Sequence, residues 1–138
     1  SKDYGIDSDV WSVTSFNELR RNGIDIERWN MLHPLEEPKK AYVAEQLEEY
    51  KGPAVAATDY MRSFPEQIRP FLGNRNFLTL GTDGFGRSDL RSQLRKHFEV
   101  NRYYIVVAAL KSLADLDEII NFIRQPITGK KFFNPLSN

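Results

Sequence analysis

The stretch Phe77-Leu-Thr-Leu-Gly-Thr-Asp-Gly-Phe-Gly-Arg-Ser-Asp89 decides the fold class of this chain. Residues Phe77 to Leu80 have the length and apolar composition of a buried strand, and a glycine-rich turn, Gly81 to Gly86, follows them. Ser88 and Asp89 stand where a helix N-cap belongs, ahead of Leu90, Leu94 and Phe98 at spacings of four residues. A strand, a turn and a helix in direct succession are typical of an α/β protein with a parallel sheet.

The same alternation continues upstream of this stretch. Ala54 to Thr58 is a second apolar run of strand length, and Ser63, followed by Phe64 and Pro65, begins a helix that we expect to end near Leu72 and Gly73. Helical spacing over residues 41–50 predicts another helix, which Gly52 and Pro53 stop.

The N-terminal third predicts one more strand and two more helices. Val10 to Thr14 is rich in β-forming residues, and Ser15 with Glu18 is a helix-start signal for a helix that ends at Gly23. Ile26, Trp29 and Leu32 recur at helical spacing and predict a second, short helix, which runs into a stiff loop at Pro34 and Pro38.

The last third is apolar over Tyr103 to Leu110, which fits a buried helix or a strand. Continuation of the pattern through Leu116 to Ile123 favours a helix. The strands are nearly uninterrupted apolar runs, as in a parallel sheet covered on both faces. Three strands are few for such a sheet, which suggests that part of the sheet is missing from the chain.

Composition narrows the class of protein. The chain has 138 residues, 19 basic and 19 acidic side chains and no cysteine. Zero net charge argues against nucleic acid or an anionic membrane as the partner, and the lack of cysteine excludes disulfides, thiolate metal sites and cysteine nucleophiles. No apolar run approaches the roughly 18 residues of a membrane span, and the first residues do not resemble a signal peptide. We expect one soluble domain, compatible with a cytoplasmic location.

The turn Gly81 to Gly86 joins a strand to a helix, which is where backbone amides bind phosphate in many folds. It matches neither the dinucleotide fingerprint nor the nucleoside triphosphate loop, because it lacks a correctly placed third glycine and a Lys before Ser88. A tight turn that needs positive backbone torsions at glycine is the better interpretation.

Arg87, Arg91 and Arg95 recur every four residues and are expected on one helix face. They could contact an anionic partner, although a solvated face opposite the apolar stripe is the better interpretation, and Glu66 or Asp89 could pair with them. The candidate anion-contact residues of this region are Asp83, Arg87, Ser88 and Arg91.

The segment Glu27 to Pro34 combines large apolar residues, an Arg and a proline loop, a composition found at interface hot spots. Its candidate contact residues are Trp29 and His33. Packing of Trp29 and Leu32 against the domain's own core is the alternative, and His33 is expected to position the loop rather than to transfer protons.

Catalytic machinery is missing from the pattern of residues. Only His33 and His97 supply imidazole, no metal-ligand spacing occurs, and no nucleophile elbow of glycine, serine and glycine is present. We therefore predict no catalytic, cofactor-binding or metal-binding residue in this chain.

Four segments carry a resemblance that covers about residues 3 to 114 in order: Ser8-Asp-Val-Trp-Ser-Val-Thr-Ser-Phe-Asn-Glu-Leu19, Glu27-Arg-Trp-Asn-Met-Leu-His-Pro34, Pro53-Ala-Val-Ala-Ala-Thr-Asp-Tyr-Met61 and Leu80-Gly-Thr-Asp-Gly-Phe-Gly-Arg-Ser-Asp89. They resemble the C-terminal domain of the homodimeric bacterial pyruvate dehydrogenases, which are thiamine diphosphate-dependent and transketolase-like.

The resemblance implies a three-layer α/β/α sandwich with a mostly parallel sheet. It also implies that thiamine diphosphate and magnesium are held by the two preceding domains of the parent chain, across the interface of a homodimer. The parent would decarboxylate pyruvate and pass the acetyl group to a lipoyl group, in a complex with dihydrolipoyl acetyltransferase. The family's diphosphate-binding motif does not occur in this sequence.

The family's domain begins with a further strand and helix, and Ser1 to Gly5 match only the end of that helix. We therefore expect residues 1–138 to form a single domain that lacks its first strand and most of its first helix, and the exposed sheet edge to pair with a neighbour. The alternative function is an interaction or regulatory module that binds a partner protein or an anionic metabolite. Its candidate surface is the turn Thr82 to Ser88 with Arg91, plus the loop Trp29 to Pro34.

Overall fold

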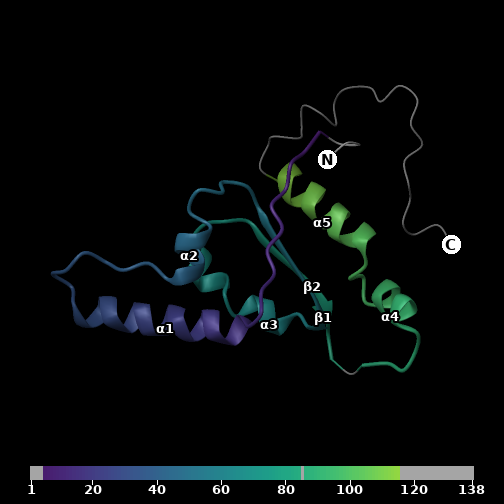
Figure 1. Ribbon diagram of the computed structural model, residues 1–138, viewed down its shortest axis with the longest axis horizontal. Coiled ribbons are helices and arrows are strands. Elements are labelled where there is room, and N and C mark those ends of the chain that lie inside the picture. Colours follow the sequence, from purple (N-terminus) through teal and green to yellow (C-terminus); the bar gives the residue numbers. More distant parts are fainter. Residues whose placement is uncertain (1–4, 85, 116–138) are drawn as a thin grey trace.

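A computed structural model describes residues 5–84 and 86–115 of the chain (Figure 1). In chain order its elements are α1 (Phe16–Leu32), α2 (Tyr42–Gln46), β1 (Ala54–Met61), α3 (Ser63–Glu66), the 3-10 helix η1 (Arg69–Leu72), β2 (Phe77–Thr82), α4 (Arg91–His97) and α5 (Arg102–Ala114). Figure 1 shows α5 along one side of the two strands and α1, α2 and α3 on the other. The predicted α/β class is confirmed, with helices on both sides of a parallel sheet.

The two strands pair in parallel, with Ala54 opposite Phe77 and Ala57 opposite Leu80. The register then changes, because the next pair is Met61 with Thr82. Four residues of β1 therefore span the same distance as two residues of β2, which defines a bulge at the carboxyl end of β1. Both strands were predicted, and each extends further toward its carboxyl end than its apolar run indicates.

The main buried cluster lies between the sheet and the helices on the α1 side, and Val100 and Ala108 are buried outside it. The buried residues of this cluster are Ala41, Val43, Ile68, Leu72 and Phe77, and the half-buried residues Phe16, Leu19 and Phe71 pack against them. A cluster this small leaves much of each helix exposed, so the hydrogen bonds and ion pairs described below have a large part in fixing the loops.

The first helix is one continuous helix, so the prediction of two helices separated at Gly23 is wrong. Gly23 is buried inside α1, and a Cβ at this position would lie 2.6 Å from the ring of Phe71. The glycine serves close packing of α1 on η1 and does not end the helix. The predicted start is confirmed, since the Ser15 hydroxyl accepts a hydrogen bond of 3.2 Å from the Glu18 amide.

The strand predicted at Val10 to Thr14 is also wrong. These residues form no strand, and Val10 is 94% exposed, because no neighbouring strand within the described residues pairs with them. The helix predicted over 41–50 ends at Gln46. Beyond it, Arg75 donates hydrogen bonds to the carbonyls of Leu47, Tyr50 and Gly52, which hold the following loop in a non-helical path.

The helix predicted from Ser63 is divided into α3 and η1. Downstream, α4 begins one or two residues later than Ser88 and Asp89 indicate: Leu90 is its N-cap, and the Asp89 carboxylate accepts a bond of 2.6 Å from the Leu90 amide.

The helical alternative for the apolar run is confirmed by α5, and the predicted continuation through Leu116 to Ile123 lies outside the described residues. Within 5–84 and 86–115, no helix combines the length and apolar character that crossing a membrane requires.

Candidate functional site at the carboxyl ends of the strands

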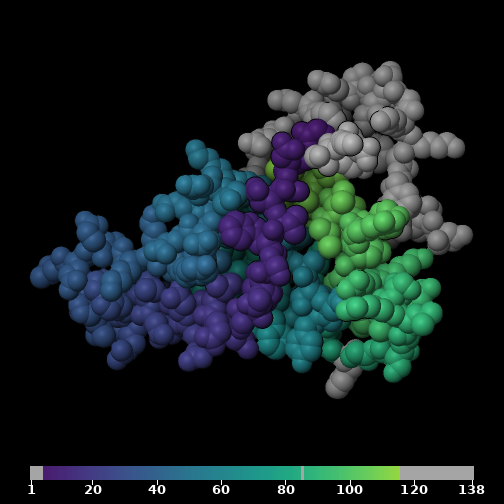
Figure 2. Space-filling view, viewed as in Figure 1, coloured from purple at the N-terminus to yellow at the C-terminus, as the bar shows by residue number. Residues whose placement is uncertain are grey.

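The carboxyl ends of β1 and β2 meet helix α4, and charged side chains gather there. Ligands of open α/β folds bind at this edge of the sheet, because loops and helix ends surround it. In the space-filling view the surface of α4 adjoins the surface at the ends of the strands (Figure 2). This edge is therefore the first place to look for a functional site.

Asp59 is the centre of this group. Its carboxylate accepts hydrogen bonds from Arg95 at 2.9 and 2.6 Å and from Arg91 at 3.2 Å. The bulge in β1 sets Asp59 where both arginines of α4 reach it. Hydrogen bonding by Arg95 holds the pKa of the Asp59 carboxyl below its ordinary value, against a smaller opposing effect of partial burial.

A second ion pair joins the ends of the two strands. Arg62 Nε lies 2.6 Å from Asp83 Oδ1, and both side chains are more than half exposed. The Arg62 amide also donates a bond of 3.1 Å to the Thr82 carbonyl. Asp83 thus holds the turn after β2 against the end of β1.

The glycine-rich turn uses its glycines in different ways. Gly84 has a φ of +118°, which L side chains rarely adopt, so the interpretation as a tight turn is confirmed at this position. Gly81 has no positive φ, but its Cα lies against the backbone of the β1 bulge: a Cβ would meet the Arg62 nitrogen at 2.7 Å and the Tyr60 oxygen at 2.8 Å.

Glu66 binds a different arginine from those predicted. Its carboxylate accepts a two-point interaction from Arg69, at 2.6 Å from Nε and 2.7 Å from Nη2, and a hydrogen bond from the buried Thr79 hydroxyl. The Arg69 hydrogen bonds hold the pKa of Glu66 below its ordinary value. The Glu66 carboxylate binds Arg69 and Thr79, and the Asp89 carboxylate accepts a hydrogen bond from the Leu90 amide. The expected pairing of these two acids with the α4 arginines is therefore wrong.

The predicted arginine face is only partly present. Arg91 and Arg95 lie on α4 and bind one carboxylate, whereas Arg87 precedes the helix and does not share its face. Arg87 and Ser88 are exposed, and neither makes a hydrogen bond or an ion pair with the described residues.

Trp29 and His33 lie at the other end of the molecule, at the end of α1 (Figure 1). Their rings stack at 4.3 Å between centroids, and His33 Nδ1 lies 2.8 Å from the Trp29 carbonyl oxygen. Lys39 Nζ lies 3.7 Å from the centroid of the Trp29 ring. His33 thus contacts Trp29 at the end of α1, its expected role in positioning the loop stays a prediction, and the structure does not bring this pair to the α4 arginines.

The residues of this candidate site that sequence reasoning missed are Asp59 and Arg62, and Arg95 was seen only as part of the arginine series. A signal for Asp59 was present, because it follows the predicted strand Ala54 to Thr58 as Asp83 follows the predicted strand Phe77 to Leu80. Carboxyl ends of neighbouring parallel strands meet at one edge, so the two acids could have been placed together.

The chemistry available at this edge is that of paired ions. Asp59, Glu66 and Asp83 each face an arginine, and no described side chain has a buried polar atom without a hydrogen-bond partner. The described residues also contain no group of three or more His, Asp or Glu side chains that could hold a metal ion. The arrangement can fix loops and present arginines, because Asp59, Glu66 and Asp83 are each already paired with an arginine.

The sequence matches the family model described as the transketolase-like TK C-terminal domain over residues 1–101. It is 60% identical over 118 residues to the pyruvate dehydrogenase E1 component of Buchnera aphidicola from Acyrthosiphon pisum, 58% identical over 119 residues to that of Escherichia coli K12, and 56% identical over 117 residues to that of Pseudomonas aeruginosa PAO1. These alignments cover 85 to 86% of this chain and 13% of each relative. The chain therefore spans a small part of the length of these relatives.

Proposed function

We propose, because the chain belongs to the transketolase-like C-terminal domain family, that residues 1–138 are the C-terminal domain of a pyruvate dehydrogenase E1 component. Identity of 56 to 60% to three such components over most of the chain supports this proposal. In it, the domain supports the dimer and the surroundings of an active site that other domains build.

The parent protein, in this proposal, decarboxylates pyruvate in the cytoplasm and transfers the acetyl group to a lipoyl group. Its partners are the N-terminal and middle domains of the same chain, the second subunit of a homodimer, and dihydrolipoyl acetyltransferase. Thiamine diphosphate and magnesium belong to the preceding domains. The described residues of this chain do not fit that cofactor, because the acids at the strand ends face arginines and form no cluster of metal ligands.

One observation carries the supporting role: the charged groups at the carboxyl ends of the strands neutralise one another. Asp59 is bound by two arginines and Asp83 by Arg62, so the edge that holds ligands in many α/β folds is used here to tie α4 and the turn to the sheet. A catalytic acid or base would need a carboxylate or imidazole directed at a substrate without such a partner.

The test is an assay of the full-length parent, which should have about 900 residues, since 118 aligned residues are 13% of a relative. We expect pyruvate-dependent reduction of an artificial electron acceptor that requires thiamine diphosphate and magnesium. The 138-residue chain alone should give no turnover. A full-length protein that ignores pyruvate and acts on another 2-oxo acid or on a sugar phosphate would contradict the proposal.

A second candidate function is a contact with an acidic surface of a partner protein. Arg87 is exposed without an ion pair to the described residues, and Arg91, whose side chain is 79% exposed, makes one contact of 3.2 Å. We expect pull-down with the acetyltransferase core to capture the chain if these arginines bind it. Unchanged capture by the variant Arg87→Ala with Arg91→Ala would discard this surface.

A further inference from the structure

The end of α1 and the loop after it carry an exposed apolar group far from α4. Met31 is 72%, Leu32 55% and Leu35 99% exposed. We call Trp29, Met31, Leu32, His33 and Leu35 the α1 tip. Burying a leucine of this exposure removes a large apolar surface from water, so a partner gains more at this tip than at a polar loop.

Contacts within the chain hold both ends of the α1 tip although the tip is exposed. The Trp29 and His33 rings stack, and Lys39 lies over the Trp29 ring at 3.7 Å. Asn30 closes the loop from the helix side, because its amide donates to the Lys39 carbonyl at 2.9 Å and accepts from the Lys39 amide at 2.8 Å. A loop fixed at both ends loses little conformational entropy on binding, which is the property of a preorganised contact.

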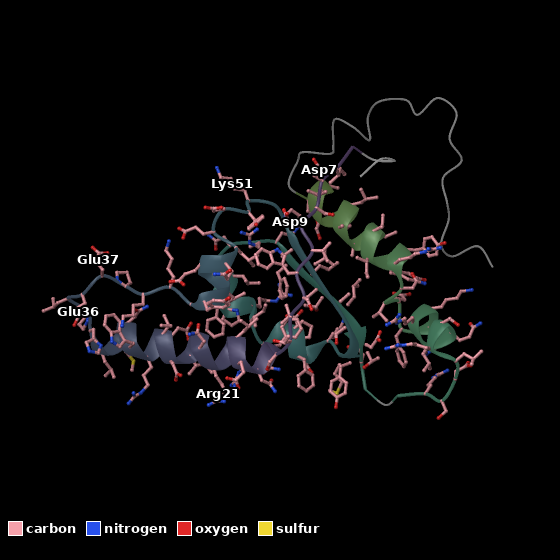
Figure 3. All side chains as sticks on the ribbon, in the orientation of Figure 1. Asp7, Asp9, Arg21, Glu36, Glu37 and Lys51 are labelled. Carbon is pink, nitrogen blue, oxygen red and sulfur yellow. The ribbon has the colours of Figure 1, made fainter. Side chains whose placement is uncertain are left out.

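The surroundings of the tip define the chemistry of its partner. Glu36 and Glu37 directly follow Leu35 and extend outward from the far end of the loop (Figure 3). Neither makes an ion pair with the described residues. Beside the loop, a hollow of about 460 Å³ lies between Ile26, Lys39 and Tyr42. A complementary surface would offer an apolar pocket for Leu35, a basic rim for the two glutamates and a side chain that enters the hollow.

We propose that the α1 tip docks the domain onto the preceding domains of its own parent chain. The inference rests on the proposed function, in which the chain is about an eighth of a longer polypeptide, since it covers 13% of its relatives. Most of the parent's surface is therefore outside this chain and is tethered to it. Tethering raises the effective concentration of that surface, so a few apolar anchors suffice for docking.

The test uses the full-length parent with a photoreactive benzophenone side chain in place of Leu35. The control carries the same group in place of Lys51, which is exposed and lies away from the α1 tip (Figure 3). After irradiation we expect a crosslink within one chain from position 35, mapped to a preceding domain by mass spectrometry. Its yield should exceed that from position 51 at least tenfold.

Equal yields from the two positions would overturn the proposal. Products of twice the chain mass would also overturn it, because they would place a second copy at the tip, as would crosslinks to acetyltransferase alone. Pyruvate decarboxylation measured on the same preparations separates the two proposals: an active parent without the crosslink refutes docking only, and an inactive parent refutes the proposed function.

Substitutions at Leu35 give an independent readout. Leu35→Asp should weaken docking about tenfold to a hundredfold, the equivalent of burying one leucine, and should speed proteolytic release of the domain from the parent accordingly. Leu35→Met keeps an apolar side chain and should change the release rate less than threefold. Because Leu35 is 99% exposed, neither variant should alter folding of the domain itself, and equal release rates would contradict the docking.

Discussion

Replacing Gly81 by alanine should destabilise the domain by about 1 to 3.5 kcal/mol. The added Cβ would lie 2.7 Å from the Arg62 nitrogen and 2.8 Å from the Tyr60 oxygen, so β1 must retreat by about 0.7 Å to reach an ordinary contact of 3.4 Å. Overpacking of this kind costs about 1 to 3 kcal/mol, and losing the bond from the Arg62 amide to Thr82 adds about 1 kcal/mol. Alanine also restricts the unfolded chain more than glycine does, which offsets about 0.4 to 1 kcal/mol of this loss.

Urea unfolding of the 138-residue chain measures this loss. For a slope of about 2 kcal/mol per molar urea, the midpoint of Gly81→Ala should fall by about 0.5 to 1.8 M. Gly86→Ala is the matched control, because no heavy atom lies within 4 Å of its Cβ and its φ is not positive, and its midpoint should not fall. Equal midpoints for Gly81→Ala and the unsubstituted 138-residue chain would refute the close approach of the two strands.

Three further predictions concern the loops and helix ends. Glu66 has a lowered pKa in the folded state, so its contribution to stability is fully present above its ordinary pKa of 4.5 and is lost as the pH falls through its folded-state pKa. Glu66→Gln should therefore flatten the acid side of a profile of stability against pH measured by urea unfolding. Arg75→Lys should lower the free energy of unfolding by about 1 to 3 kcal/mol, because an ammonium cannot reach the three carbonyls that the guanidinium binds, whereas Arg21→Lys on the exposed face of α1 should change it by less than about 0.5 kcal/mol. Asn101→Ala should cost about 0.5 to 2 kcal/mol in thermal unfolding, because the Asn101 side chain accepts from two amides at the start of α5; an unchanged melting temperature would contradict the cap.

Local patterns predicted the elements that depend on local chemistry. Ser15 predicted the start of α1 because an N-cap acts within one turn, and the apolar runs from Ala54 and Phe77 predicted β1 and β2. Gly84 was assigned to a tight turn for its backbone freedom, and the structure gives it a positive φ. Each of these properties is fixed within a few residues of the sequence.

Elements that depend on distant residues could not be predicted in this way. Gly23 has the sequence signature of a helix end, and only the ring of Phe71, 48 positions later, shows why the helix continues. Arg75 holds the chain after the end of α2 in a non-helical path by binding the carbonyl of Leu47, 28 positions before it. Val10 belongs to a run of β-forming residues, but a strand needs a paired neighbour, and none lies beside it in the described chain.

The candidate site shows the same division. Arg91 was selected from the spacing of the arginines, but its partner Asp59 depends on the bulge in β1, which no residue type announces. Arg87 was assigned to the same helix face because spacing alone does not show where α4 begins. Trp29 and His33 stack on each other, whereas the positioning role of the histidine and the proposed role of the α1 tip in docking stay predictions.

The central claim is that this chain supports a thiamine diphosphate enzyme without holding the cofactor. Titration calorimetry of thiamine diphosphate with magnesium into the 138-residue chain tests it most directly, with the full-length parent as the positive control. We predict a saturable heat for the parent and only heats of dilution for the chain. Binding to the chain with a dissociation constant below about 1 μM, which corresponds to about 8 kcal/mol, would contradict the claim.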